Sequence, residues 1–143
     1  MNTMWSKASA ILLLGSTLLL SSHPTPMYAA SSTYSVTFQQ ARLLSNDHVG
    51  NEWSIAAQVA DQAISEGKTM NVKVDSSGSI KLYAYVVEED KIPDEGENTK
   101  TIKVSSISSK GTTFKVNVTV TENRGRYSGN EAVWEFTYKI KKQ

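Results

Sequence analysis

The most chemically distinctive stretch of the sequence is acidic. Residues 86–98 read VVEEDKIPDEGEN, and six carboxylates fall within the ten residues 88–97. Carboxylates that alternate with other residues beside a glycine supply the oxygen ligands that calcium takes in flexible loops. The candidate ligands from this stretch are Glu88, Asp90 and Asp94. The alternative is a solvated loop whose acidic side chains bind nothing.

A second candidate site lies in residues 122–130, which read ENRGRYSGN. Arginine binds carboxylates and phosphates through paired donors, and the glycines let the chain turn. Arg124, Arg126 and Tyr127 are therefore the candidate ligand-binding residues. The alternative is a long hairpin connection whose arginines are solvated or pair with the acidic stretch.

Residues for nucleophilic or zinc catalysis are scarce. The chain has no cysteine and two histidines, and His23 lies in the N-terminal targeting stretch, which leaves His48. No Gly-x-Ser-x-Gly elbow is present, and tetrahedral zinc needs several His or Cys ligands. A glycosidase pair of carboxylates needs a long cleft that so short a chain scarcely builds. The sequence predicts a protein that is not an enzyme.

Alternation of apolar and polar residues predicts β-strands along the chain. The expected strands are residues 34–38, 53–59, 70–74, 80–87, 102–104, 114–121 and 133–140. Turn-forming residues separate them at 75–78, 108–111 and 123–130. Seven or eight short strands at this spacing favour an all-β antiparallel sandwich, with a small barrel as the alternative.

Two segments allow alternative readings. Ala56–Glu66 (AAQVADQAISE) suits a helix, but a hairpin turning at Asp61-Gln62 is favoured. Tyr83 and Tyr85 share one face of a strand, opposite Leu82, Ala84 and Val86. If that face is exposed, the tyrosines make a carbohydrate platform; if a second sheet covers it, they are core. The remaining large aromatics are assigned to packing: Trp53, Trp134 and Phe136.

The N-terminal residues have the pattern of a secretory signal peptide. Lys7 is followed by an apolar run of 13 residues, 8–20, which is too short to span a bilayer as a helix. Cleavage is expected after Ala29 or Ala30, with a retained anchor as the alternative. Residues 1–30 are thus the expected signal peptide, and residues 31–143 a single domain. Without cysteine, a bacterial exported protein is the natural source.

The charge composition limits the classes of partner that the domain would attract. Residues 31–143 hold 14 Lys and Arg against 14 Asp and Glu. No net charge draws the domain onto nucleic acid or an anionic membrane. We therefore expect no nucleic-acid partner.

Two segments resemble C2-type domains. Residues 36–52, VTFQQARLLSNDHVGNE, resemble the family's opening strand and first acidic loop, and residues 80–96 resemble a later strand ending in a second acidic loop. The resemblance implies an eight-stranded sandwich whose loops bind calcium and then phospholipid head groups. The expected sandwich is C2-like or immunoglobulin-like. The implied calcium ligands are Asp47, Glu52, Glu88, Asp90 and Asp94.

The resulting hypothesis is a secreted, non-enzymatic binding module that uses calcium to bind an envelope, lipid or other extracellular ligand. The first alternative is a secreted inhibitor that binds another protein through the Arg124–Asn130 loop. The second is a structural protein of an envelope or matrix that adds strands edge to edge.

Overall fold

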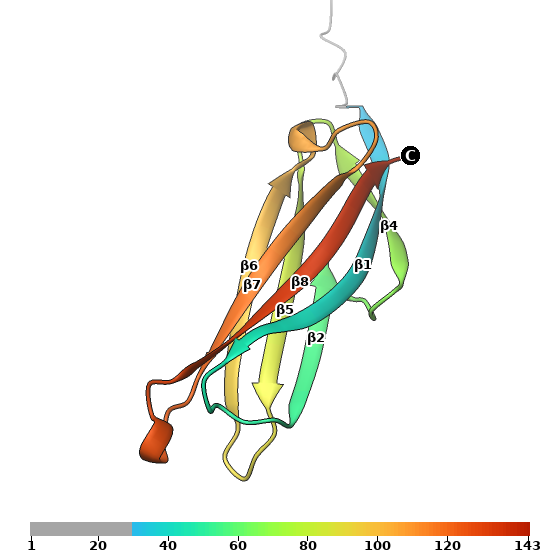
Figure 1. Ribbon diagram of the computed structural model, residues 1–143. Helices are drawn as coiled ribbons and strands as arrows, with labels where there is room; N and C mark the ends of the chain where they lie inside the picture. Colours follow the sequence, from blue (N-terminus) through green and yellow to red (C-terminus); the bar gives the residue numbers. More distant parts are fainter. Residues whose placement is uncertain (1–29) are drawn as a thin grey trace, which may run out of the picture.

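Two antiparallel β-sheets packed face to face make up the protein. The computed structural model describes residues 30–143 (Figure 1). The expected signal peptide lies almost wholly outside the described residues, so its cleavage stays a prediction. No helix in the described part of the chain has the length and apolar character needed to cross a membrane.

Each sheet has four strands. Sheet A contains, in spatial order, β4 (Thr69–Asp75), β1 (Ser31–Asn46), β8 (Glu131–Lys142) and β7 (Thr112–Thr121). Sheet B contains β3 (Gln62–Ala63), β2 (Trp53–Val59), β5 (Ser79–Glu88) and β6 (Asp94–Lys103). Two short 3-10 turns complete the described chain, η1 (Val104–Ser106) and η2 (Gly125–Tyr127). The predicted eight-stranded sandwich is confirmed.

Alternation places the apolar side chains between the sheets. Val116, Val118 and Val120 of β7 are buried, while the residues between them are exposed. At the centre, the ring of Phe38 stacks on Phe136 and Tyr138, with centroids 5.6 and 5.2 Å away. Each such side chain contributes about 1.5–3 kcal/mol when it leaves water. The assignment of Trp53, Trp134 and Phe136 to packing is also confirmed.

Tyr138 joins the two sheets. Its hydroxyl donates a hydrogen bond to the backbone carbonyl of Tyr83 at 2.9 Å, so the buried hydroxyl has an acceptor. Burial raises the pKa of the Tyr138 hydroxyl well above its usual range. Tyr138 therefore stays neutral at physiological pH, and its hydrogen bond links the two sheets within an apolar core.

The segment Ala56–Glu66 forms the favoured hairpin. β2 turns into β3 through Ala60 and Asp61, whose φ angles are 48° and 64°. Two successive positive φ angles are typical of the type I′ turn, whose twist suits a hairpin. The turn falls one residue earlier than expected. An ion pair between Lys81 and Asp61 and a hydrogen bond from the Ala60 amide to the Lys81 carbonyl fasten it to β5.

The sequence pattern did not indicate most of β6. We expected a strand only over residues 102–104, but β6 begins at Asp94. Its inward positions face the edge of β7, where the Asn98 amide donates to the Asn117 carbonyl at 2.7 Å and Lys100 Nζ to the Lys115 carbonyl at 3.1 Å. These polar side chains bond to the exposed edge of β7, so β6 needs no apolar alternation.

Candidate functional site: the loop end

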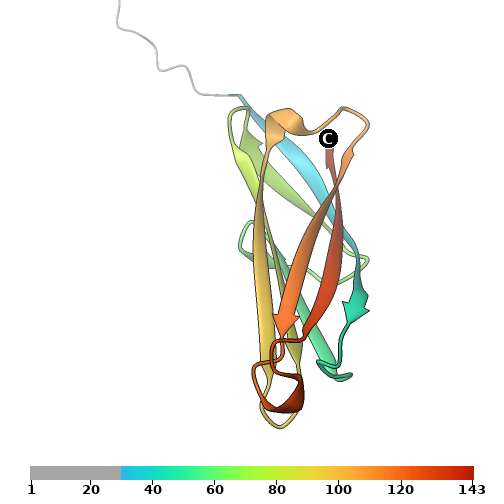
Figure 2. The ribbon, with the colours of Figure 1, turned by 60° about the vertical axis from the view of Figure 1, so that its left-hand side comes forward.

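Three loops meet at one end of the sandwich (Figures 1 and 2). They are residues 47–52 between β1 and β2, residues 89–93 between β5 and β6, and residues 122–130 between β7 and β8. We call this surface the loop end. Every predicted site residue lies on it or at the adjoining strand ends: Asp47, Glu52, Glu88, Asp90, Asp94, Arg124, Arg126 and Tyr127.

The acidic stretch is not a single loop. Glu88 ends β5 and Asp94 begins β6, and the two residues are partners in the β5–β6 ladder. Glu88 is 2% exposed and Asp94 is 5% exposed. The stretch is therefore not one continuous loop, because the strands extend into it from both sides and only residues 89–93 connect them.

Glu88 holds the first loop against β5. Its carboxylate accepts the backbone amides of Asp90 at 3.1 Å and Glu52 at 3.5 Å. Gly50 lies directly against it: an added Cβ would stand 2.1 Å from Glu88 Oε1, and the φ of Gly50 is +145°. The site therefore requires glycine at position 50, both for space and for backbone conformation.

Asp94 holds a different loop. Its Oδ1 accepts hydrogen bonds from the Asn123 side-chain amide at 2.8 Å and the Asn123 backbone amide at 3.3 Å. Glu88 and Asp94 are adjacent across the ladder, yet they fasten different loops. The two buried carboxylates thus act as anchors for the loop end.

The side chains of two further predicted ligands, Asp90 and Asp47, also make local contacts. Asp90 accepts the Ile92 amide at 2.7 Å, and Asp47 contacts the His48 ring nitrogen at 2.8 Å. Within residues 30–143, no cluster of three or more His, Asp or Glu side chains is arranged to hold a metal ion. The calcium site stays a prediction.

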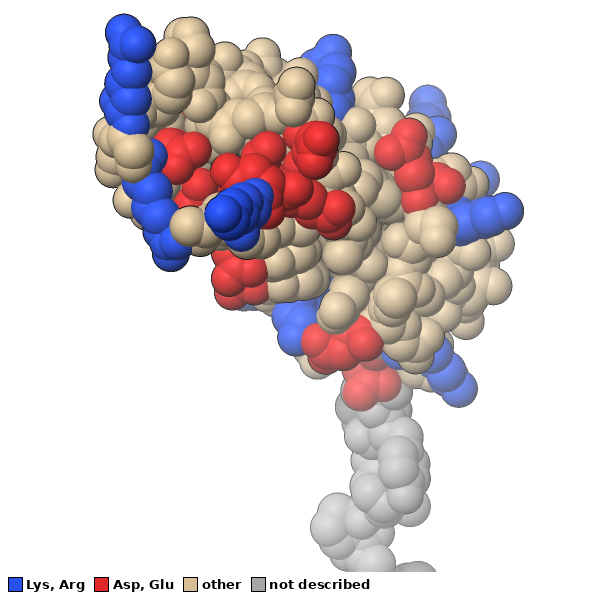
Figure 3. All heavy atoms as spheres, turned by 90° about the horizontal axis from the view of Figure 1, so that it is seen from below, with Lys and Arg blue, Asp and Glu red and all other residues tan. Residues whose placement is uncertain are grey.

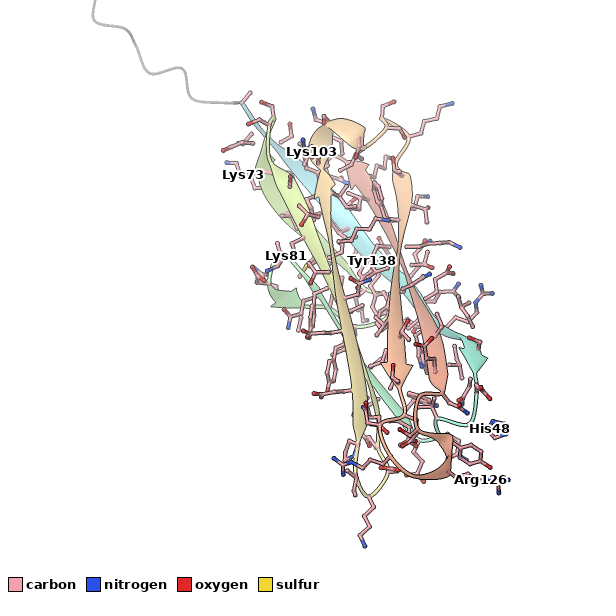
Figure 4. All side chains as sticks on the ribbon, turned by 90° about the vertical axis from the view of Figure 1, so that its left-hand side faces the viewer. His48, Lys73, Lys81, Lys103, Arg126 and Tyr138 are labelled. Atoms are coloured by element: carbon pink, nitrogen blue, oxygen red, sulfur yellow. The ribbon has the colours of Figure 1, made fainter. Side chains whose placement is uncertain are left out.

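An aromatic contact joins the first and third loops. The Tyr127 ring stacks on the His48 ring, with centroids 4.7 Å apart and planes 12° apart. The Arg126 guanidinium carbon lies 5.7 Å from the centre of the Tyr127 ring, within range of a cation–π contact. Figure 4 shows His48 and Arg126 side by side at this end. Tyr127 keeps 40% of its surface exposed.

His48 is the residue that sequence reasoning missed. It was considered only for catalysis, because nothing in its neighbourhood along the chain indicates a stacking partner. Its positive φ of 57° marks the tight turn that presents the ring. Such a φ is uncommon outside glycine, but it is visible only in the structure.

The charges of the loop end are arranged unevenly. Acidic side chains spread across it, and basic side chains project both at its margin and from among the acids (Figure 3). In the described part of the chain, the lysine and arginine ion pairs involve Arg42, Lys81 and Lys115. Arg124 and Arg126 are in none of them, so their guanidinium groups are not neutralised by the acidic stretch.

Neither the comparison with models of known protein families nor the comparison with curated proteins gives a match for this chain. The resemblance to C2-type domains therefore stays a prediction carried by the two quoted segments.

Proposed function

We propose that the protein is an exported, non-enzymatic binding module whose ligand docks on the loop end. The observation that carries the proposal is the joining of three loops into one surface. Glu88 fastens the first loop, Asp94 fastens the third, and the His48–Tyr127 stack connects them. Preorganised loops lose less conformational entropy on binding, which favours affinity.

The exposed groups indicate the chemistry of the ligand. Arginine and tyrosine are the residue types most often found at the energetic centre of binding surfaces. Arg126 and Tyr127 lie in contact and exposed, and Arg124 adds a second guanidinium. A ligand that presents phosphate or carboxylate groups to these residues fits them best. The nearby acids would repel it from the centre, so the ligand would approach from the arginine side.

Calcium belongs to this proposal as a co-ligand. Glu52, Glu89 and Asp90 are exposed beside the buried anchor Glu88. A divalent cation at these carboxylates would reduce the repulsion of an anionic ligand. It would also explain why so many acids are kept at a binding end.

A co-sedimentation experiment tests the proposed function. The purified protein is mixed with vesicles of phosphatidylglycerol or phosphatidylcholine, and separately with purified bacterial cell wall, in EDTA or in calcium. We expect it to sediment with phosphatidylglycerol vesicles or cell wall. The double variant Arg126→Ala, Tyr127→Ala should bind about tenfold more weakly.

Lys110→Ala is the matched control, because Lys110 is an exposed cation in the 108–111 turn at the opposite end. Equal loss of binding in this control, or no sedimentation with either material, would contradict the proposal. A stoichiometric complex with a secreted hydrolase would support the inhibitor alternative instead. Concentration-dependent assembly of the protein alone would support the structural one.

A further inference from the structure

The outer face of sheet B carries two tyrosines that the proposed function does not use. Leu82, Ala84 and Val86 of β5 are fully buried, so Tyr83 and Tyr85 between them point away from sheet A. The sandwich has two layers, and no described element covers this face (Figure 2). Of the two readings of this tyrosine pair, the structure favours the exposed one.

Hydrogen bonds hold both tyrosines in the same pose. The Tyr83 hydroxyl donates to Glu97 Oε2 at 2.5 Å, and the Tyr85 hydroxyl donates to Glu95 Oε2 at 2.5 Å. In the ladder, however, Tyr83 lies opposite Thr99 and Tyr85 opposite Glu97. Each hydroxyl therefore reaches a glutamate on β6 that lies two residues nearer the loop end than the ladder partner of its own tyrosine. The two tyrosines are two residues apart on β5, a spacing of about 7 Å along the strand.

Neither Glu95 nor Glu97 has an ion-pair partner among the described residues. Glu95 and Glu97 are exposed, and the lysine and arginine ion pairs within residues 30–143 use other carboxylates, those of Glu135 and Asp61. A neutral ligand that covered the tyrosines would displace water from the two carboxylates and supply no cation in its place. Such desolvation of unpaired charges costs binding free energy. A cationic ligand would gain from both carboxylates and from the faces of the rings.

The strand that carries the tyrosines offers no backbone edge to a peptide strand. β5 is hydrogen-bonded to β2 on one side and to β6 on the other, so it offers no free edge under the tyrosines. Extended peptides bind mainly at sheet edges or in grooves. A flat, ringed and cationic molecule suits a flat aromatic surface better.

We propose that Tyr83, Tyr85, Glu95 and Glu97 bind a polysaccharide of amino sugars that carry free, protonated amines. The apolar faces of successive sugar rings lie on the two tyrosines, and their ammonium groups bind the two carboxylates. The exposed side chain of Thr99 and the partly exposed side chain of Gln58 border the tyrosines and supply hydrogen-bonding groups to sugar hydroxyls. This site is separate from the loop end and does not depend on it.

Calorimetric titration of the purified protein tests the inference with three probes: a β-1,4-linked glucosamine hexamer, its fully N-acetylated form and hexalysine. The titration is run in a mildly acidic buffer, so that the amines of the glucosamine hexamer are protonated. We expect the glucosamine hexamer to bind, and the other two to bind at least about tenfold more weakly. Binding of the glucosamine hexamer should also weaken as salt is added.

Two double variants locate the site. Tyr83→Ala with Tyr85→Ala removes the rings, and Glu95→Gln with Glu97→Gln removes the charges while keeping acceptors for the tyrosine hydroxyls. Each should weaken binding of the glucosamine hexamer by about tenfold. The matched control is Glu131→Gln, at an exposed acid at the start of β8, which should leave this binding unchanged.

Three results would overturn the inference. They are a glucosamine hexamer that does not bind, an N-acetylated hexamer or hexalysine that binds equally well, and a Gln double variant that binds with unchanged affinity. Since the Gln variant keeps the size and the hydrogen-bond acceptors of the glutamates, it tests the charge even if the alanine variant fails to fold. Failure here leaves the sedimentation assay of the loop end unaffected.

Discussion

The hydrogen bond between Tyr83 and Glu97 changes how a single tyrosine titrates. The pKa of Tyr83 rises from 10.0 to about 12, first because its hydroxyl donates to the Glu97 carboxylate, and then through partial desolvation and the charge of Glu97. The protonated hydroxyl is thus favoured in the folded state. The resulting stabilisation is complete below pH 10.0 and is lost as the pH rises toward about 12.

Removing the charge of Glu97 should therefore lower the pKa of Tyr83 back toward its usual value. Glu97→Gln is the test, read by carbon NMR of the tyrosine rings during a titration to high pH. Glu131→Gln, an exposed acid at the start of β8, is the matched control and should leave Tyr83 unchanged. If the pKa of Tyr83 stays at about 12 in Glu97→Gln, the hydrogen bond to Glu97 is not the cause of the raised pKa.

For other residues, the sequence predicted a candidate site residue but not the contacts that the residue makes in the fold. The acids Glu88 and Asp94 were identified from the sequence as candidate ligands, and in the structure each accepts hydrogen bonds from backbone or side-chain amides of a loop. The reason is burial, because a carboxylate without water needs donors close by. The Asp90 amide that binds Glu88 is local, but the donors from Glu52 and Asn123 are distant along the chain, and no local pattern connects them to the two acids.

At the scale of elements, the β2–β3 hairpin carries avoidable strain. Ala60 has a φ of 48°, a left-handed conformation that costs a residue with a Cβ about 1–2 kcal/mol. Ala60→Gly should relieve it. After the larger entropy of the unfolded glycine is subtracted, we expect a net gain of about 0.5–1 kcal/mol. Thermal melts should show a rise of about 2–5 °C.

Ala56→Gly is the matched control for this prediction. Ala56 is exposed in the same strand, β2, with no positive φ, so the same substitution should destabilise the protein by about 0.5–1 kcal/mol. Opposite signs at positions 56 and 60 would confirm the turn geometry. A loss of stability in both variants would contradict it.

Strands that place alternate side chains on the core were easier to predict than β6. β5 and β7 alternate clearly because one face of each lies on the core. β6 carries Asn98 and Lys100 at inward positions, and their partners are carbonyls of β7. Gly96 fits the same contact, since an added Cβ would stand 2.2 Å from the Thr119 carbonyl oxygen. Such an edge contact leaves no hydrophobic pattern in the sequence.

At the scale of the whole molecule, the antiparallel topology brings distant loops together. β1, β5 and β7 all end at the loop end, so the turns that follow them are neighbours in space. If calcium binds among these loops, the entire fold should gain stability. Extracellular calcium modules bind at about 0.1–1 mM, and binding at a hundred times Kd adds about 2.7 kcal/mol.

We accordingly expect 10 mM calcium to raise the melting temperature by about 10 °C over EDTA, with magnesium as the control ion. The chain from residue 31 onward is suitable, because every described strand lies within it. Asp90→Asn should abolish the rise, since Asp90 is an exposed candidate ligand and not one of the two buried anchors. An equal melting temperature in EDTA and calcium would contradict the calcium prediction.

The sequence by itself determined the strands that pack on the core, the hairpin after β2 and the sandwich, since alternation and turn residues are local consequences of burying one face of a strand. Only the tertiary structure decided the extent of β6, the anchoring roles of Glu88 and Asp94, the stack of His48 on Tyr127 and the exposure of the Tyr83–Tyr85 face. Each of these depends on a partner from a distant part of the chain or on which face a second sheet covers. The topology of the fold determines both the distant partner and the covered face, and the local sequence pattern carries no information about either.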